Sequence, residues 1–384
     1  MSWPKKKLSE VAQVNPRRAL IERDDVTFTS FVPMEAVDEI LGQVTQTITQ
    51  PYSKVKKGYT YFENGDVIFA KITPCMQNGK HAVANNLIDG FGFGSTEFHV
   101  IRASEKIIPE WIHYYLRRKQ TLDAALKTFT GTVGQQRVPD VFLENLEIPV
   151  PPPETQRQIA AHLKAQLAEV ESARQAAQVQ LREITKLGDS IVYDSIKKAA
   201  SMPRTLGDVL DEVKKGIGQS WKNYPVLGAT RGGLAPAREQ PGKQAPKYKP
   251  VFPGSTVFYN PMRILIGSIA FVDEDDTPGI TSPDYVVLQG KEGMVDSRWF
   301  YHWLRSPLGE QCILSLARGA VRERMLFNRL AEGAIDLPSF EEQEKASLAL
   351  KELRPLQRAI EQQLREINLL PQKILAQAFE NKNG

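Results

Sequence analysis

The sequence repeats itself once at a spacing of nearly 190 residues, and a duplication of this length restricts the fold more than any other feature of the chain. Four groups of residues recur in the same order, at offsets of 187 to 189. Matched positions, first copy before second, include Gly65 and Gly254, Phe69 and Phe258, Glu97 and Asp284, Trp111 and Trp299, and Gln156 and Gln343. Because such a repeat is far longer than that of a solenoid, it predicts two tandem domains with one fold.

Each copy contains the same succession of expected elements. Alternating apolar and polar residues, as in Thr96 to Ile101, predict half-buried strands, and a helix follows them. A proline-rich segment then precedes a long run with few helix breakers. The predicted parts are a first α/β (α+β) domain at 1–150, a long helix at 151–200, a second such domain at 201–338 and a second long helix at 339–384.

Both long helices carry an apolar stripe at helical spacing. The residues of the two stripes are Leu163, Leu167, Val170, Ala177, Leu181, Ile184 and Ile191 in the first helix, and Leu353, Ile360, Ile367 and Ile374 in the second. The pentapeptide at 180–184 recurs at 363–367, an offset of only 183, so the second helix is about one turn shorter while its stripe stays in phase.

These stripes leave two arrangements open. Each helix could pack on its own domain, or the two helices could pack on one another. A stripe of about forty residues is longer than a small domain covers, which favours an antiparallel coiled-coil pair. We therefore expect two domains in pseudo-twofold tandem, separated by this helical pair.

Sequence motifs for catalysis are incomplete. The glycine-rich run at 90–94 resembles a methyltransferase loop, but the nearest candidate for the required N-P-P-Y tetrapeptide, at 260–263, lacks the aromatic residue that would stack on a flipped base. Gly242 and Lys243 are followed by Gln244, which breaks the Walker A pattern. The histidines and the two cysteines, Cys75 and Cys312, show no metal-ligand spacing. We expect a chain that is not an enzyme and binds no metal or cofactor.

Charge and hydropathy set broader limits. The net charge of +4 is compatible with a polyanionic partner without requiring one. No run of about eighteen apolar residues occurs, and no apolar segment follows the basic N-terminus, so neither a membrane span nor a signal peptide is expected. These features predict a cytoplasmic protein.

Two proline-containing helix entries resemble those of a known family. The segments are IPVPPPETQRQIAAHL at 148–163 and IDLPSFEEQ at 335–343. They are similar to the entries that follow each recognition domain in the specificity subunits of type I restriction-modification systems, although Asp336 replaces a proline and Thr155 a common acidic residue. The strings at 65–80 and 92–98 resemble one class of these recognition domains, and those at 259–263 and 282–287 resemble a second class.

This resemblance implies a specificity subunit whose two target-recognition domains each read one half of a bipartite DNA target. It also implies two methyltransferase subunits docked on the helices, and motor-nuclease subunits added for cleavage. Adenosylmethionine, ATP and Mg would then bind partner subunits and not this chain. A different class of function stays open, namely a coiled-coil scaffold that assembles other proteins without contacting DNA.

Candidate DNA-reading residues lie in two polar loops of each domain. Arg, Lys, Asn and Gln side chains are the types that hydrogen-bond to base edges. The candidates are Lys71, Thr73, Gln77, Asn78, Lys80, Gln135, Gln136 and Arg137 in the first domain, and Asn260, Arg263, Arg318, Arg322 and Arg324 in the second. The alternative is that they are solvated loop residues, with Lys71 or Asn260 capping a turn.

Candidate partner-binding residues lie on the helix faces away from the predicted seam. These faces should be exposed and should dock the methyltransferase subunits. The candidates are Arg157, His162, Arg174, Arg182, Gln343, Arg358 and Arg365.

Overall fold

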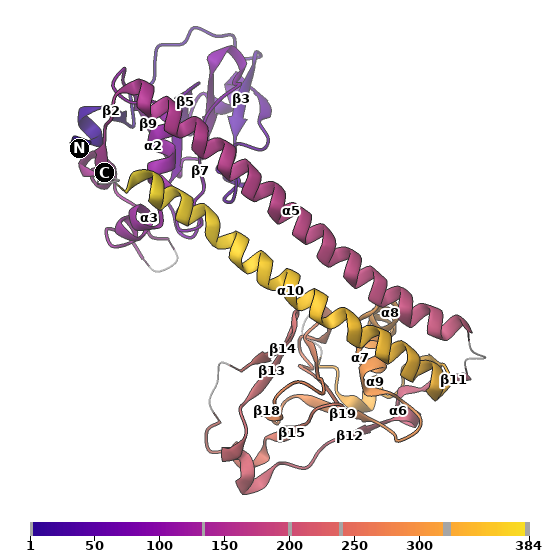
Figure 1. The fold of residues 1–384 in the computed structure, drawn as a ribbon. Helices are drawn as coiled ribbons and strands as arrows, with labels where there is room; N and C mark the ends of the chain where they lie inside the picture. The colour runs from indigo at the N-terminus through magenta and orange to yellow at the C-terminus, as the bar shows by residue number, and fades with distance from the viewer. Residues whose placement is uncertain (1–2, 133–134, 199–201, 238–240, 318–323, 381–384) are drawn as a thin grey trace. The chain divides into compact units, whose positions relative to one another are not determined.

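The computed structural model describes residues 3–132, 135–198, 202–237, 241–317 and 324–380 (Figure 1). The chain divides into two compact units, Met1–Ala176 with Leu364–Gly384 and Ala177–Gln363. The long helix α5 (Pro153–Lys198) begins in the first unit and ends in the second, whereas α10 (Phe340–Phe379) begins in the second and ends in the first. None of the described helices is long and apolar enough to cross a lipid bilayer.

The first unit contains two four-stranded sheets with flanking helices. One antiparallel sheet has the order β2 (Ala12–Val14), β9 (Phe98–Ala103), β6 (Val67–Ala70) and β7 (His81–Val83). The other has the order β4 (Ile48–Pro51), β3 (Phe28–Val32), β8 (Phe91–Gly94) and β5 (Thr60–Glu63), with β3 and β8 parallel. This unit also contains the pair β1 (Lys5–Lys7) and β10 (Glu147–Pro149), and helices α1 (Tyr52–Val55), α2 (Pro109–Leu116), α3 (Lys119–Leu126) and α4 (Asp140–Asn145).

The second unit repeats the first sheet. Its strands have the order β12 (Leu210–Glu212), β19 (Val286–Gly290), β16 (Thr256–Tyr259) and β17 (Ile269–Val272), all antiparallel. Three strand pairs accompany it: β11 (Met202–Thr205) with β20 (Ala334–Leu337), β13 (Leu227–Thr230) with β14 (Gly233–Pro236), and β15 (Lys249–Val251) with β18 (Gly279–Thr281). The helices are α6 (Leu206–Val209), α7 (Ser297–Arg305), α8 (Pro307–Leu316) and α9 (Phe327–Leu330). The duplication predicted from sequence is thus present as two mixed α/β domains.

In each unit the helix segments pack both on one another and on the domain. Leu163 of α5 and Leu375 of α10 belong to the buried core of the first unit, where the ring of Phe379 lies 4.5 Å from that of Trp111. In the second unit, Gly188 of α5 approaches the side chain of Leu350 of α10. The two arrangements left open by the sequence therefore occur together, and the predicted antiparallel helix pair is confirmed.

A buried glutamine joins each long helix to its domain. Gln156 is fully buried, its Oε1 accepts the N–H of Ile108 at 2.9 Å, and its Nε2 donates to the carbonyls of Lys106 and Pro151. At the equivalent position of the second repeat, Gln343 is also fully buried and makes the same three kinds of bond. Its partners are Asp296 N–H, Met294 O and Pro338 O.

These bonds overturn one expectation. Gln343 was predicted to lie on an exposed face that docks a partner, and that prediction is wrong because the side chain has no exposed surface. Both ends of its amide are already satisfied by backbone groups of its own domain. The glutamine that resembles the family motif therefore fixes the start of the helix.

We expect Gln343→Leu to lower the free energy of unfolding of the second unit by about 1–3 kcal/mol, because it leaves three backbone groups without their partner. Urea unfolding would measure the loss. Gln156→Leu should have a similar effect on the first unit, and Gln363→Leu, at an exposed position of α10, should change little. Equal effects of Gln343→Leu and Gln363→Leu would contradict this role.

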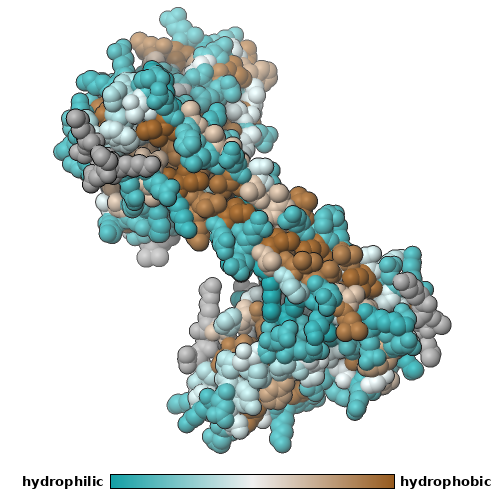
Figure 2. Space-filling view, in the orientation of Figure 1, coloured by the Kyte–Doolittle hydropathy of each residue, from teal (hydrophilic) through white to brown (hydrophobic). Residues whose placement is uncertain are grey.

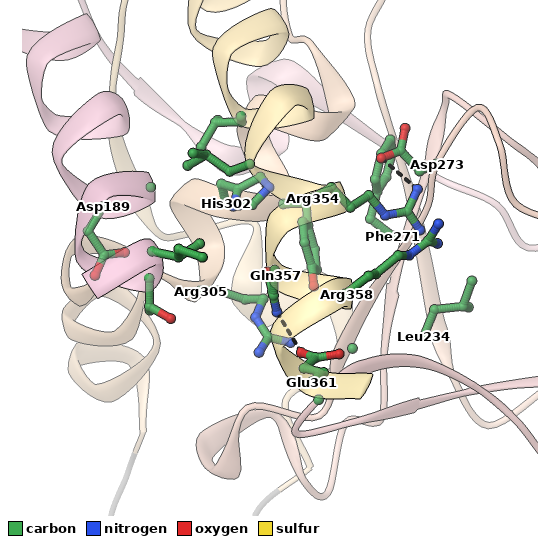
Figure 3. A pocket seen from close by; sticks show the side chains of 18 of the residues that line it. Asp189, Leu234, Phe271, Asp273, His302, Arg305, Arg354, Gln357, Arg358 and Glu361 are labelled. Atoms are coloured by element: carbon green, nitrogen blue, oxygen red, sulfur yellow. Dashed lines mark hydrogen bonds and ion pairs between the residues drawn. The ribbon is translucent and has the colours of Figure 1, made fainter. Parts of the chain in front are cut away.

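Ion pairs add a second connection between α10 and the second domain. Arg354 bridges the carboxylates of Asp273 and Asp276 at 2.8 and 2.5 Å, and Arg358 lies 2.8 Å from Asp276. These groups line a polar pocket of the second unit together with side chains of α5 and α7 (Figure 3). Arg358, predicted to be a partner-binding residue, is thus engaged with its own domain, although its side chain stays 54% exposed.

Candidate nucleic-acid interface

The two predicted loops of the first domain lie side by side. Residues 71–80 connect β6 to β7, and residues 135–138 follow α3. The Thr73 N–H donates to the carbonyl of Gln136 at 3.0 Å, and the Val138 N–H donates to the carbonyl of Lys71 at 2.9 Å. Residues more than sixty positions apart in sequence therefore form one polar surface.

The side chains of this surface differ in availability. Gln77, Asn78 and Gln135 are exposed, whereas Lys71 and Gln136 are half-buried. Lys80 donates its Nζ to the carbonyls of Val37 at 3.0 Å and Met34 at 3.4 Å, and the hydroxyl of Thr73 is buried. Lys80 therefore stabilises the loop, the Thr73 hydroxyl is not accessible to a partner, and the amide side chains of Gln77, Asn78 and Gln135 face solvent.

Arg137 is held by an acidic residue from the sheet. Its Nε and one terminal nitrogen each lie 2.8 Å from an oxygen of Glu97, a bidentate pairing. The hydrogen bond from Arg137 lowers the pKa of Glu97, against an opposing effect of burial. Arg137 also donates to the carbonyl of Gln135 at 3.2 Å. The arginine thus orients its own loop.

Two residues that were not predicted from the sequence, His99 and Asn15, support the loops. Nε2 of buried His99 lies 2.8 Å from the carbonyl of Val138, and its Nδ1 lies 3.0 Å from the side chain of Asn15. For Glu97, the acidic partner of Arg137, the sequence does contain a signal, because Glu97 recurs as Asp284 in the second repeat. No comparable signal marked His99, because its partners are distant in sequence.

The second domain brings its loops together in the same way. The Met325 N–H donates to the carbonyl of Pro261 at 3.0 Å, and the hydroxyl of Tyr259 donates to the carbonyl of Met325 at 3.0 Å. Arg324 lies 3.5 Å from Asp284, and both groups are largely exposed. Glu97 with Arg137 and Asp284 with Arg324 are both related by an offset of 187, so the acid–arginine pair is itself duplicated.

The other candidates of the second domain divide three ways. Asn260 accepts the N–H of Met262 at 3.0 Å and so caps a turn, whereas Arg263 is exposed. Arg318 and Arg322 lie outside the described residues. Within the part of the chain that the structure describes, no group of three or more His, Cys, Asp or Glu side chains could hold a metal ion.

The predicted partner-binding residues also differ in exposure. His162, Arg182 and Arg365 are exposed, and Arg157 is an exposed residue paired with Glu154. Arg174 is only 20% exposed in its bidentate pairing with Glu171, so it is less accessible than predicted.

Apolar side chains also remain exposed on both helices (Figure 2). They are Val179, Leu187 and Tyr193 on α5, and Leu348, Leu356, Leu369 and Leu370 on α10. A docking face on these helices would therefore combine charged and apolar groups.

Comparison with known proteins gives a consistent assignment. Residues 2–180 match the family model described as the type I restriction modification DNA specificity domain. Over 158 residues, 41% of this chain, the sequence is 37% identical to the specificity subunits of the type I restriction enzymes EcoAI and EcoEI from Escherichia coli. The match spans 26% of each of those proteins.

Solved structures extend the likeness in fold to the whole chain. One similar chain comes from a structure that concerns complex assembly and conformational transition of the type I R-M system. Its comparison with this chain gives a TM-score of 0.65 and 21% sequence identity, and covers 98% of this chain and 97% of that one. The type I restriction-modification S subunit from M. genitalium has a TM-score of 0.52 and 14% identity, with 99% and 97% covered. Residues 2–180 are thus similar in sequence to the type I restriction modification DNA specificity domain, which the sequence motifs also resemble, and the likeness in fold to the solved structures covers nearly the whole chain.

Proposed function

We propose that this chain reads DNA for a type I restriction-modification complex, each domain recognising one half of a bipartite target. The carrying observation is that each domain joins two sequence-distant loops by a backbone hydrogen bond, between Val138 and Lys71 in the first domain and between Met325 and Pro261 in the second. Loops held on a rigid sheet are suited to placing side chains against base edges.

In this proposal the chain is not an enzyme. Two methyltransferase subunits dock on the exposed faces of α5 and α10, and motor-nuclease subunits join for cleavage. Adenosylmethionine, ATP and Mg bind those partners, and adenine methylation is their reaction. The exposed apolar side chains of the two helices support such docking, because large exposed apolar groups mark protein interfaces.

Methylation profiling of DNA from cells that carry this chain and its partner subunits tests the proposal. Exchange of residues 1–147 for the domain of another such subunit should change one half of the methylated motif only. A change in both halves would contradict independent reading. A scaffold that never contacts DNA would instead show no duplex binding in a gel-shift titration, and no steep loss of affinity with salt.

The amides at the tip of the first domain should carry base recognition. We expect Gln77→Ala with Asn78→Ala to weaken binding of the specific duplex at least tenfold, because each lost bidentate base contact is worth about 1–3 kcal/mol. Non-specific binding should change much less. Asn85→Ala, an exposed amide outside both loops, is the matched control. If the double variant and the Asn85→Ala control bind the specific duplex with equal affinity, Gln77 and Asn78 do not contribute to base recognition.

A further inference from the structure

The tip of the second domain is built on the same turn as that of the first. The carbonyls of Met76 and Ile264 accept the N–H groups of Gly79 and Gly267, both at 2.9 Å. These two glycines have φ angles of 81° and 79°, a conformation that other residues adopt poorly. All equivalent positions differ by 188 in sequence. We call residues 75–80 and 263–268 the tip turns.

A second backbone hydrogen bond also corresponds between the tip turns. Lys80 N–H donates to the carbonyl of Cys75 at 3.0 Å, and Ser268 N–H to that of Arg263 at 3.1 Å. Met76 and Ile264 anchor the turns in the two cores, where they are 0% and 3% exposed. The duplication has therefore preserved the backbone of this turn together with its buried anchor.

The two exposed positions of the turn have different chemistry in the two domains. Gln77 and Asn78 of the first domain are replaced by Leu265 and Ile266, which are 47% and 64% exposed. The amides are hydrogen-bonding side chains and so were predicted to read DNA, whereas the aliphatic pair was not predicted to do so.

This aliphatic exposure is imposed by the backbone. Ile266 N–H donates to the carbonyl of Arg263 at 3.2 Å. Ile264, which lies between these two residues in the sequence, points into the core. The hydrogen-bonded turn cannot rotate Leu265 and Ile266 inward without losing that anchor. Arg263 beside them is exposed and positively charged, which suits a polyanionic partner.

We propose that Leu265 and Ile266 read the second half-site by contacting the C5 methyl groups of thymines. This inference rests on the proposed function and deepens it. Their positions are those of the amides that read bases in the first domain. The thymine methyl is the apolar group that base pairs present in the major groove, and aliphatic side chains recognise it by exclusion of water.

The test uses the complete chain with its methyltransferase partner and duplexes in which deoxyuridine replaces thymine, a change that removes only the methyl group. Replacement in the second half-site should weaken binding about fourfold for each contacted methyl. Replacement at the thymines of the first half-site should have less effect, because its tip carries amides that bond to other groups. Unchanged affinity after full replacement in the second half-site overturns the proposal.

A reciprocal variant separates this contact from other roles of the tip. Leu265→Gln with Ile266→Asn restores the chemistry of the first domain on the same turn and should abolish the deoxyuridine effect. A different result would show that the tip turn binds protein and that the proposal is wrong. In that case the unsubstituted chain shows no deoxyuridine effect, and the double variant no longer binds its partner subunits. Absence of binding to the unmodified duplex would count against the proposed function itself.

Discussion

Replacement of Asp273 by alanine should lower the free energy of unfolding of the second unit by about 3–5 kcal/mol, because it leaves a buried guanidinium without its main counter-charge. The side chains of Asp273 and Arg298 are 6% and 7% exposed and lie 2.5 Å apart. Burial by itself would raise the pKa of Asp273, but the hydrogen bond and charge of Arg298 hold it below its ordinary value. Urea unfolding followed by tryptophan fluorescence would report the change.

A neighbouring carboxylate provides the matched control. Glu274 also contacts Arg298, at 3.2 Å, but its side chain is 53% exposed, so Glu274→Gln should cost less than about 1 kcal/mol. Asp273→Ala combined with Arg298→Met should recover part of the loss, since no buried charge then remains unpaired. Similar costs for Asp273→Ala and Glu274→Gln would show that burial of the pair is not the source of the effect.

Lowering the pH from 7 to 5.5 should destabilise the first unit by roughly 2–3 kcal/mol, through two buried histidines. His81 and His113 pack with ring centroids 5.5 Å apart, close to Arg117. Burial, followed by the charge of Arg117, lowers the pKa of His113 to about 3, and burial lowers that of His81 well below its ordinary value. Both rings therefore stay neutral in the folded unit across this range.

The direction follows from proton binding. Below pH 6.5 the unfolded chain protonates these histidines and the folded unit does not, so the unfolded state gains stability as the pH falls. The loss begins at about pH 6.5 and continues toward the folded pKa. His113→Asn should reduce this pH dependence by about half. His162→Gln, at an exposed position of α5, should leave it unchanged, and a flat profile from pH 7 to 5.5 would exclude the mechanism.

Much of the fold was accessible from the sequence because its signals are local or repeated. The proline-containing entries preceded helices that begin at Pro153 and Phe340, and the recurrence of Phe69 as Phe258 reflected equivalent central strands β6 and β16. The role of Gln343 was not accessible. Its three partners include backbone groups of residues 294 and 296, which only the folded domain brings to the helix.

The candidate interface was predicted in part for a similar reason. A polar, glycine-containing segment identifies a loop, so Gln77 and Asn78 were found directly. Whether a side chain in such a loop is free depends on tertiary contacts, which occupy Lys80 and Arg137. Leu265 and Ile266 were missed because an aliphatic pair in a sequence suggests a core. Its exposure depends on the burial of Ile264 between the turn and the domain.

The sharing of α5 and α10 between the two units has a consequence for synthesis of the chain. Leu375 and Phe379 complete the core around Trp111, yet they are synthesised about 200 residues after Ala176, where the first segment of that unit ends. At typical rates of translation the interval is roughly 10–40 s. During that time the first domain presents an incomplete apolar core, which α10 covers later. Nascent chains should therefore depend on chaperones or on prompt completion, and premature termination before residue 364 should leave an aggregation-prone fragment although every strand of the first domain is present.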